Sequence, residues 1–209
     1  MYREFAENEV KPLAEELDEE ERFPMETVEK MAKLGMMGIY FPKEYGGAGA
    51  DVLSYAMCVE ELAKVCGTTA VIVSAHTSLC AAPIFENGTE EQKKYYLPKL
   101  CSGEWLGAFG LTEPGAGTDA QGQQTIAKEE DDCWVLNGSK IFITNAPKAD
   151  TYVVFAVTTP DIVLYMAAAQ AANTPAGQSS MGMTGLADMQ AASSESTATD
   201  TVTAAPTAD

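Results

Sequence analysis

Residues 109–119 read FGLTEPGAGTD, and the interpretation of the fold starts from this stretch. An apolar, strand-like beginning runs into a turn in which Pro114 fixes the backbone and two glycines, Gly115 and Gly117, remove side chains. Bare backbone at such a turn lets a ligand approach closely. Thr112 lies at the end of the predicted strand and offers a hydroxyl that can donate or accept a hydrogen bond. The stretch predicts a binding surface at the end of a β-sheet.

A second stretch, residues 137–145, reads NGSKIFITN and supports the first. Asn-Gly is a strong hairpin signal, which predicts that strands at 133–136 and 140–144 flank a turn. Phe109 and Phe142 lie near strand ends, where they can contact the face of a planar ring, and Thr112 and Thr144 can bond its edges. Each residue taken singly is more often a packing residue of a sheet. The combination favours a bound aromatic heterocycle with polar edges.

Residues 1–103 are predicted to be helical. Apolar residues at helical spacing predict a helix at 2–17, interrupted at Pro12, and a second helix that begins near Pro24. The apolar face of the second helix comprises Val28, Met31, Leu34 and Met37.

Two side chains are predicted to cap further helices in this region. Asp51 can cap a helix that extends through Cys66, and Thr89 with Gln92 has the spacing of a capping box. Between them, a helix that includes residues 71–85 is apolar nearly all round, which is typical of a helix buried on most sides.

After residue 105 the pattern changes from helix to strand. Further strands are predicted at 105–112, 124–128 and 152–157. A helical block followed by strands predicts an α+β chain, in which an all-α N-terminal domain at 1–103 precedes a partial antiparallel β domain at 104–160.

Residues 161–209 contain no Lys or Arg and are dominated by Ala, Ser, Thr and Gly. So few large apolar side chains cannot offset about 1–2 kcal/mol of backbone entropy per residue. The segment is predicted to be a low-complexity, disordered tail.

The charge balance excludes some classes of partner. The 209 residues include 31 acidic and 13 basic side chains, which gives a net charge of −18. Nucleic acids and anionic membrane surfaces select clustered Lys and Arg, so neither is an expected partner. The N-terminus lacks the apolar region of a signal peptide. The sequence contains no unbroken run of about 18 apolar residues, so no transmembrane helix is predicted.

The cysteine and histidine content indicates the compartment and argues against a metal site. None of the five cysteines forms a Cys-x-x-Cys pair, which favours buried free thiols in a reducing compartment, the cytoplasm. His76 is the only histidine. Without a second His or a nearby pair of cysteines, no metal site is predicted, and His76 is expected to be packed or hydrogen-bonded.

The sequences LTEPGAGTD and KIFITN, joined by a hairpin signal, resemble the flavin-binding signature of the acyl-CoA dehydrogenase family, with the short-chain, butyryl-CoA type nearest in wording. The resemblance covers about residues 1–158. It implies the N-terminal helical domain, with its first helix truncated, and the first half of the middle β domain. The family's C-terminal helical domain is expected to be absent.

The resemblance also implies roles for individual residues. Thr112 would hydrogen-bond the pyrimidine end of the flavin, Thr144 would lie near N5, and Phe142 would lie against the ring system. Thr118 would contact the thioester substrate, while Glu113 is interpreted as structural. The residues expected to line the cofactor FAD are Phe109, Gly110, Leu111, Thr112, Gly117, Thr118, Phe142, Ile143 and Thr144.

The implied reaction is α,β-desaturation of an acyl-CoA, with hydride transfer to flavin N5 and an electron-transfer flavoprotein as acceptor. The family's base is a Glu of the C-terminal domain, so no catalytic base is assigned here. Relatives form homo-oligomers largely through that domain, so the same assembly is not expected. Three alternatives stay open: a non-catalytic flavin or acyl-CoA binder, a helical oligomerisation module, and an acyl-CoA oxidase, which shares this architecture.

Overall fold

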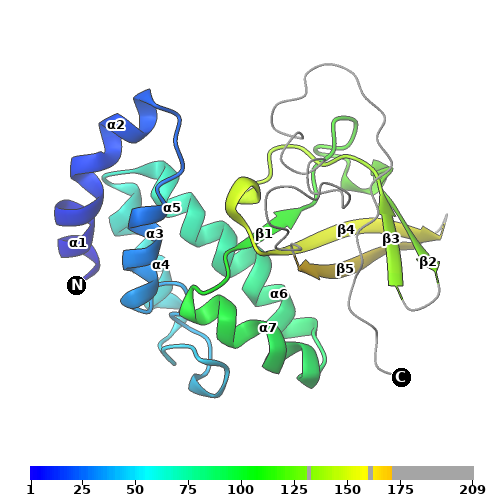
Figure 1. The fold of residues 1–209 in the computed structure, drawn as a ribbon, viewed down its shortest axis with the longest axis horizontal. Coiled ribbons are helices and arrows are strands. Elements are labelled where there is room, and N and C mark those ends of the chain that lie inside the picture. Colours follow the sequence, from blue (N-terminus) through cyan, green and yellow to red (C-terminus); the bar gives the residue numbers. More distant parts are fainter. Residues whose placement is uncertain (131–132, 160–161, 171–209) are drawn as a thin grey trace, which may run out of the picture. The chain divides into compact units, whose positions relative to one another are not determined.

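The computed structural model describes residues 1–130, 133–159 and 162–170 (Figure 1). The chain divides into two compact units. The first comprises Met1–Leu106 and is helical, and the second begins at Gly107 and contains a five-stranded sheet. The predicted α+β class, with helices before strands, is confirmed.

The first helical run follows the predicted pattern, including its interruption. It consists of α1 (Tyr2–Phe5), a π-helical turn (Ala6–Val10), a 3-10 turn (Lys11–Leu13) and α2 (Ala14–Glu19). Pro12 lies in the 3-10 turn, and because proline has no backbone N–H, regular α-helical bonding cannot pass through it.

Helix α3 (Met25–Lys33) begins directly after Pro24, as predicted. Val28 and Met31 are buried on its apolar face. The predicted apolar face, however, extends beyond the observed end of the helix. The helix ends at Lys33, so Leu34 lies beyond it and is 46% exposed, while Met37 is buried from a position outside the helix.

Both predicted caps are present. The Asp51 carboxylate accepts a hydrogen bond of 2.8 Å from the Ser54 N–H at the start of α4 (Val52–Ala63). Thr89 and Gln92 exchange the two bonds of a capping box at the start of α7 (Glu90–Ser102).

The most apolar helix is built from three segments. They are α5 (Gly67–Ser74), a π-helical run (Ala75–Ala81) and α6 (Ala82–Asn87). Over Gly67–Asn87 this is a helix long and apolar enough to cross a membrane by length and composition, and 61% of its apolar window is buried inside the structure. Such burial is typical of a core helix, as the sequence predicts.

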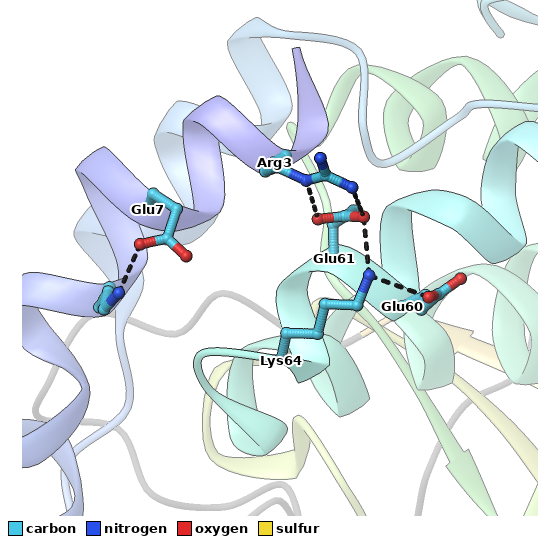
Figure 2. A network of polar contacts seen from close by, with 6 residues as sticks. Arg3, Glu7, Glu60, Glu61 and Lys64 are labelled. Atoms are coloured by element: carbon cyan, nitrogen blue, oxygen red, sulfur yellow. Dashed lines mark hydrogen bonds and ion pairs between the residues drawn. The ribbon is translucent and has the colours of Figure 1, made fainter.

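The core of the helical unit is rich in methionine. Met31, Met36 and Met37 are fully buried and pack with Leu62 and Val73. On the surface, Arg3 of α1 donates two hydrogen bonds of 3.0 Å to Glu61 of α4, and Lys64 contacts both Glu61 and Glu60 (Figure 2). Exposed ion pairs of this kind stabilise a fold only slightly, so the buried apolar groups provide most of the stability.

The sheet of the second unit is mixed. Its strands are β1 (Gly107–Gly110), β2 (Ile126–Glu130), β3 (Cys133–Asn137), β4 (Thr151–Thr159) and β5 (Ile162–Gln170). β2 with β3 and β4 with β5 are antiparallel pairs, whereas β1 and β2 both run parallel to β4. These two parallel pairings add to the antiparallel arrangement that the sequence predicts.

The prediction of a hairpin around Asn137-Gly138 is wrong. The observed hairpin joins β2 and β3, with Ile126 opposite Asn137 and Glu130 opposite Cys133. Residues 140–144 form no strand, because Lys140 turns into the interior and Phe142 adopts a left-handed backbone conformation. The strand predicted at 105–112 is confined to β1, the one at 124–128 begins at Ile126, and the one at 152–157 lies within β4.

β5 occupies the beginning of the segment 161–209 that is predicted to be a tail. Residues 171–209, for which disorder is predicted, lie outside the described residues.

Candidate functional site

The two stretches that the sequence singles out lie side by side in the sheet unit. The Ile141 N–H donates a hydrogen bond of 2.9 Å to the carbonyl oxygen of Thr112. Lys140 Nζ donates one of 2.9 Å to the carbonyl oxygen of Leu111. A third connection runs from Asn145 Nδ2 to the Gly107 carbonyl oxygen, at 3.0 Å. Thr112 and Phe142 are therefore held near each other although they are far apart in the sequence.

A buried ion pair lies beneath this junction. Lys140 Nζ is 2.7 Å from Glu113 Oε1, and the two side chains are only 2% and 5% exposed. The same ammonium group donates to Gln123 Oε1 at 3.1 Å. Burial lowers the pKa of Lys140, and the carboxylate of Glu113 opposes that change.

Glu113 is occupied by structural contacts. Its carboxylate also accepts hydrogen bonds from the backbone N–H groups of Gln124 (2.6 Å) and Thr125 (2.9 Å). Burial alone would raise the pKa of Glu113, but hydrogen bonds from Lys140, Thr125 and Gln124 outweigh it and lower the pKa. A carboxylate held ionised by so many donors is a poor proton acceptor. The structure thus agrees with the structural interpretation of Glu113.

The turn after Glu113 leaves its backbone open. Glu113 and Ala116 exchange two backbone hydrogen bonds of 3.1 Å, which close the turn around Pro114 and Gly115. A Cβ added at Gly115 or Gly117 would meet no heavy atom of the described residues within 4 Å. The space that the sequence assigns to a ligand is open at both glycines.

Phe142 presents an aromatic ring to the solvent. Its side chain is 83% exposed, and its φ of +58° places a bulky residue in the left-handed region. That conformation costs roughly 1–2 kcal/mol, and such strain gathers at ligand sites. Phe109 is half-buried and packs edge-on against Phe155, with ring centroids 5.2 Å apart. Phe142 is therefore the better placed of the two predicted aromatic residues for stacking on a ligand.

The remaining predicted residues differ in accessibility. Thr112, Thr144 and Leu111 are half-buried, and Thr118 and Gly117 are exposed. Gly110 and Ile143 are buried, Ile143 within the core of the sheet unit, so only their backbone can face a ligand.

Sequence reasoning missed Lys140, Gln123 and Asn145. All three are buried polar residues. Lys140 and Asn145 tie residues 137–145 to Leu111 and Gly107, and Gln123 accepts a hydrogen bond from Lys140. The available signal was Lys140 itself, a charged residue within the apolar stretch 140–144. If that stretch is buried, its ammonium group must find acceptors, which predicts a polar partner nearby in the fold.

The histidine and two of the cysteines are buried in the helical unit. His76 is fully buried, and burial lowers its pKa to about 4. Cys58 and Cys101 are free thiols whose pKa burial raises to about 12, so neither is a reactive nucleophile. Among residues 1–130, 133–159 and 162–170, no group of three or more His, Cys, Asp or Glu side chains could hold a metal ion.

Comparison with known proteins assigns both units to one family. Residues 1–104 match the model of the acyl-CoA dehydrogenase N-terminal domain, and residues 108–199 match that of the acyl-CoA dehydrogenase middle domain. A short-chain specific acyl-CoA dehydrogenase of Clostridium acetobutylicum is 69% identical over 158 residues, which cover 76% of this chain and 42% of the relative. The chain thus spans about two fifths of the length of the curated relatives that it matches.

Solved structures are similar as well. A chain in a structure described as the electron transferring flavoprotein of Acidaminococcus fermentans is 54% identical with a TM-score of 0.74, over 76% of this chain and 42% of that chain. A glutaryl-CoA dehydrogenase from Mycobacterium smegmatis in complex with FADH2 is 36% identical with a TM-score of 0.71, over 75% of this chain and 40% of that chain.

Proposed function

Because this chain belongs to the acyl-CoA dehydrogenase family, we propose that its sheet unit binds FAD for the α,β-desaturation of a short-chain acyl-CoA. One observation carries the proposal: the stretches 109–119 and 137–145 lie side by side, joined by the backbone hydrogen bond from Ile141 to Thr112. On them the ring of Phe142 is exposed and Thr112 and Thr144 are half-buried. A flat heterocycle with polar edges fits such a surface. The bound FADH2 of the M. smegmatis relative supports this choice of cofactor.

The residues of the surface would bind and orient the cofactor. We assign Phe142 to the face of the isoalloxazine ring, Thr112 to its pyrimidine end and Thr144 to the neighbourhood of N5. Thr118, exposed beyond the turn, would contact the acyl thioester. When bound, FAD supplies the hydride acceptor, and the protein holds the thioester within reach of it.

We propose no catalytic base among the described residues, because Glu113 is ionised and bonded on both oxygens. The resemblance places the base in a domain outside the matched part of the family. An electron-transfer flavoprotein is the proposed electron acceptor, and the similar chain in the A. fermentans flavoprotein structure supports it. The four described cysteines are free thiols, which supports the proposal that the protein functions in a reducing compartment such as the cytoplasm.

A second candidate function is flavin binding without turnover. The ion pair of Glu113 with Lys140 favours this second function. Glu113 is the carboxylate within the stretch 109–119, and because it is bound to Lys140 we do not propose it as a proton acceptor.

The visible spectrum of the purified 209-residue chain, mixed with FAD and freed of the excess, tests both functions. Retained absorbance of oxidised flavin is expected of both functions, and bleaching on addition of butyryl-CoA would show turnover, with a proton acceptor beyond the residues assigned above. Absorbance that butyryl-CoA leaves unchanged would establish the second function instead. A colourless protein would contradict both.

Substitution of Phe142 locates the flavin on the predicted surface. Phe142→Asn removes the ring, and asparagine tolerates a left-handed backbone better than phenylalanine does. We expect FAD to bind about 5–10-fold more weakly, which corresponds to a lost stacking contact of about 1 kcal/mol. Thermal stability should be equal or higher. Lys128→Met, which changes an exposed lysine on β2, is the control and should bind FAD like the wild type. Unchanged FAD affinity in Phe142→Asn would place the flavin elsewhere.

A further inference from the structure

We propose that Lys140 is a positioning residue: its buried ammonium group, paired with Glu113, fixes where the Thr112 and Phe142 segments lie relative to each other. The consequence for cofactor affinity rests on the proposed function. Neither Lys140 nor Glu113 is exposed enough to touch a ligand, since they are 2% and 5% exposed. Their effect must therefore pass through the residues that they hold.

The ammonium group joins three separate segments of the sheet unit. It donates to the backbone of Leu111 at 2.9 Å, to the side chain of Glu113 at 2.7 Å and to the side chain of Gln123 at 3.1 Å. The lysine stem runs past Gly110, where an added Cβ would lie 3.6 Å from Lys140 Cγ. One side chain thus connects Leu111, which directly follows β1, the turn at Glu113 and Gln123, which lies shortly before β2.

The neighbours of Lys140 carry this connection to the surface. Ile141, the next residue, bonds the carbonyl oxygen of Thr112 through its N–H. Phe142, one position further, has the left-handed backbone that turns its ring outward. Left-handed phenylalanine persists only where the surroundings hold it, and Lys140 and Ile141 are the described anchors on its N-terminal side.

The chemistry of the pair also favours a positioning role. A buried ion pair often contributes no more to stability than apolar residues of the same volume, because both charges must leave water. Its hydrogen bonds are directional, and here they specify the acceptors from Leu111, Glu113 and Gln123 together. Apolar side chains could fill the same space without specifying that geometry.

Two variants of the full chain test the proposal. Lys140→Met removes the ammonium group but leaves a buried carboxylate, which can unfold the unit. The double variant Glu113→Gln/Lys140→Met removes both charges and keeps the volume close to that of the wild type. Lys128→Met, which breaks the exposed pair with Glu130, is the matched control.

Each variant is measured in two ways besides its unfolding temperature. Hydrogen–deuterium exchange of the apoprotein reports the mobility of residues 111–118 and 139–146 relative to β4. Titration with FAD, followed by flavin fluorescence, gives the dissociation constant. In the double variant we expect exchange at least 10-fold faster in both segments, with β4 unchanged, and FAD affinity at least 10-fold weaker. Lys128→Met should match the wild type in both measurements.

The outcomes separate this proposal from the proposed function. Wild-type exchange in both segments of the double variant would overturn the positioning role, whatever the FAD result. Faster exchange everywhere, β4 included, would also overturn it, because the pair would then stabilise the whole unit. If the wild type binds no FAD, the proposed function fails, and local exchange still decides the positioning role.

Discussion

At the scale of single residues, burial decides what each ionisable group can do. His76 is fully buried on the π-helical run, with Nε2 3.1 Å from the carbonyl oxygen of Leu100. Burial lowers its pKa from 6.5 to about 4, although hydrogen bonds with the backbone of Leu100 and Met37 oppose the shift. The only histidine of the chain therefore acts as a neutral core residue and links its helix to α7.

This buried histidine predicts a specific dependence of stability on pH. Between pH 6.5 and about 4 the unfolded chain binds a proton at His76 that the folded chain does not, so the free energy of unfolding falls as the pH falls through this window. The loss is about 1.4 kcal/mol per pH unit at most, and about 3 kcal/mol in total. Urea unfolding followed by circular dichroism at pH 7, 5.5 and 4.5 measures it.

His76→Gln is the comparison variant, because glutamine can donate a hydrogen bond and does not titrate. Its unfolding free energy should change less with pH than that of the wild type across this window. Equal slopes for the two proteins would mean that His76 is not the group responsible.

At the scale of elements, local signals predicted helix starts better than C-terminal helix ends or strand pairing. The helix predicted to extend through Cys66 ends at Ala63. Asp51 and Thr89 cap helices as predicted, because a capping side chain and its backbone partners lie within three residues. The hairpin at Asn137 failed because a distant contact decides that region: Lys140 reaches Glu113, 27 positions earlier.

The candidate site follows the same division. Residue type and neighbouring sequence are enough to predict Phe142 and Thr112 as ligand contacts, and these contacts stay predictions. The ion pair between Glu113 and Lys140 is not predictable in this way, because a local pattern shows neither that a side chain is buried nor that its partner lies far away in the sequence.

Close packing of Gly138 against Thr125 predicts that the turn after β3 accepts only glycine at this position. A Cβ at this position would lie 2.3 Å from Thr125 Oγ1 and 2.5 Å from Thr125 Cα, and a backbone atom cannot move aside cheaply. We expect Gly138→Ala to lower the free energy of unfolding by about 1–3 kcal/mol, the usual cost of overpacking. Thermal unfolding measures the change.

Gly115→Ala is the matched control, because its Cβ would meet no described atom within 4 Å. It should leave the stability equal or slightly higher. A Gly138→Ala variant as stable as this control would show that the turn relaxes more easily than its packing indicates.

At the scale of the whole molecule, a net charge of −18 is a source of self-repulsion. The run of acidic residues near the end of α2 adds to this repulsion. Arg22 offsets it locally through ion pairs with Glu16, Glu20 and Glu26. Salt weakens repulsion between exposed charges over distances beyond the Debye length, which shrinks from about 30 Å at 0.01 M to about 8 Å at 0.15 M.

Added salt should therefore stabilise this protein. We expect the unfolding temperature to rise by about 2–4 °C between 0.01 M and 0.15 M NaCl, the shift that about 1 kcal/mol produces in a chain of this size. Glu15→Gln/Glu19→Gln, which neutralises two exposed acids of α2, should reduce that rise. An unfolding temperature that falls with salt would mean that attractive surface pairs, such as Arg3 with Glu61, outweigh the repulsion.

The parallel pairing of β1 with β4 also fixes the order in which the sheet unit can assemble on the ribosome. Gly107 pairs with Thr151, so β1 emerges about forty residues before its partner. At roughly 5–20 residues per second, translation leaves β1 without that partner for several seconds. Throughout that delay the unpaired edge of β1 is open to pairing with other chains, so we expect a chaperone that covers β1 to reduce aggregation of the nascent protein. The proposed flavin surface lies at the end of the same strand, so we expect it to form only after β4 has been made.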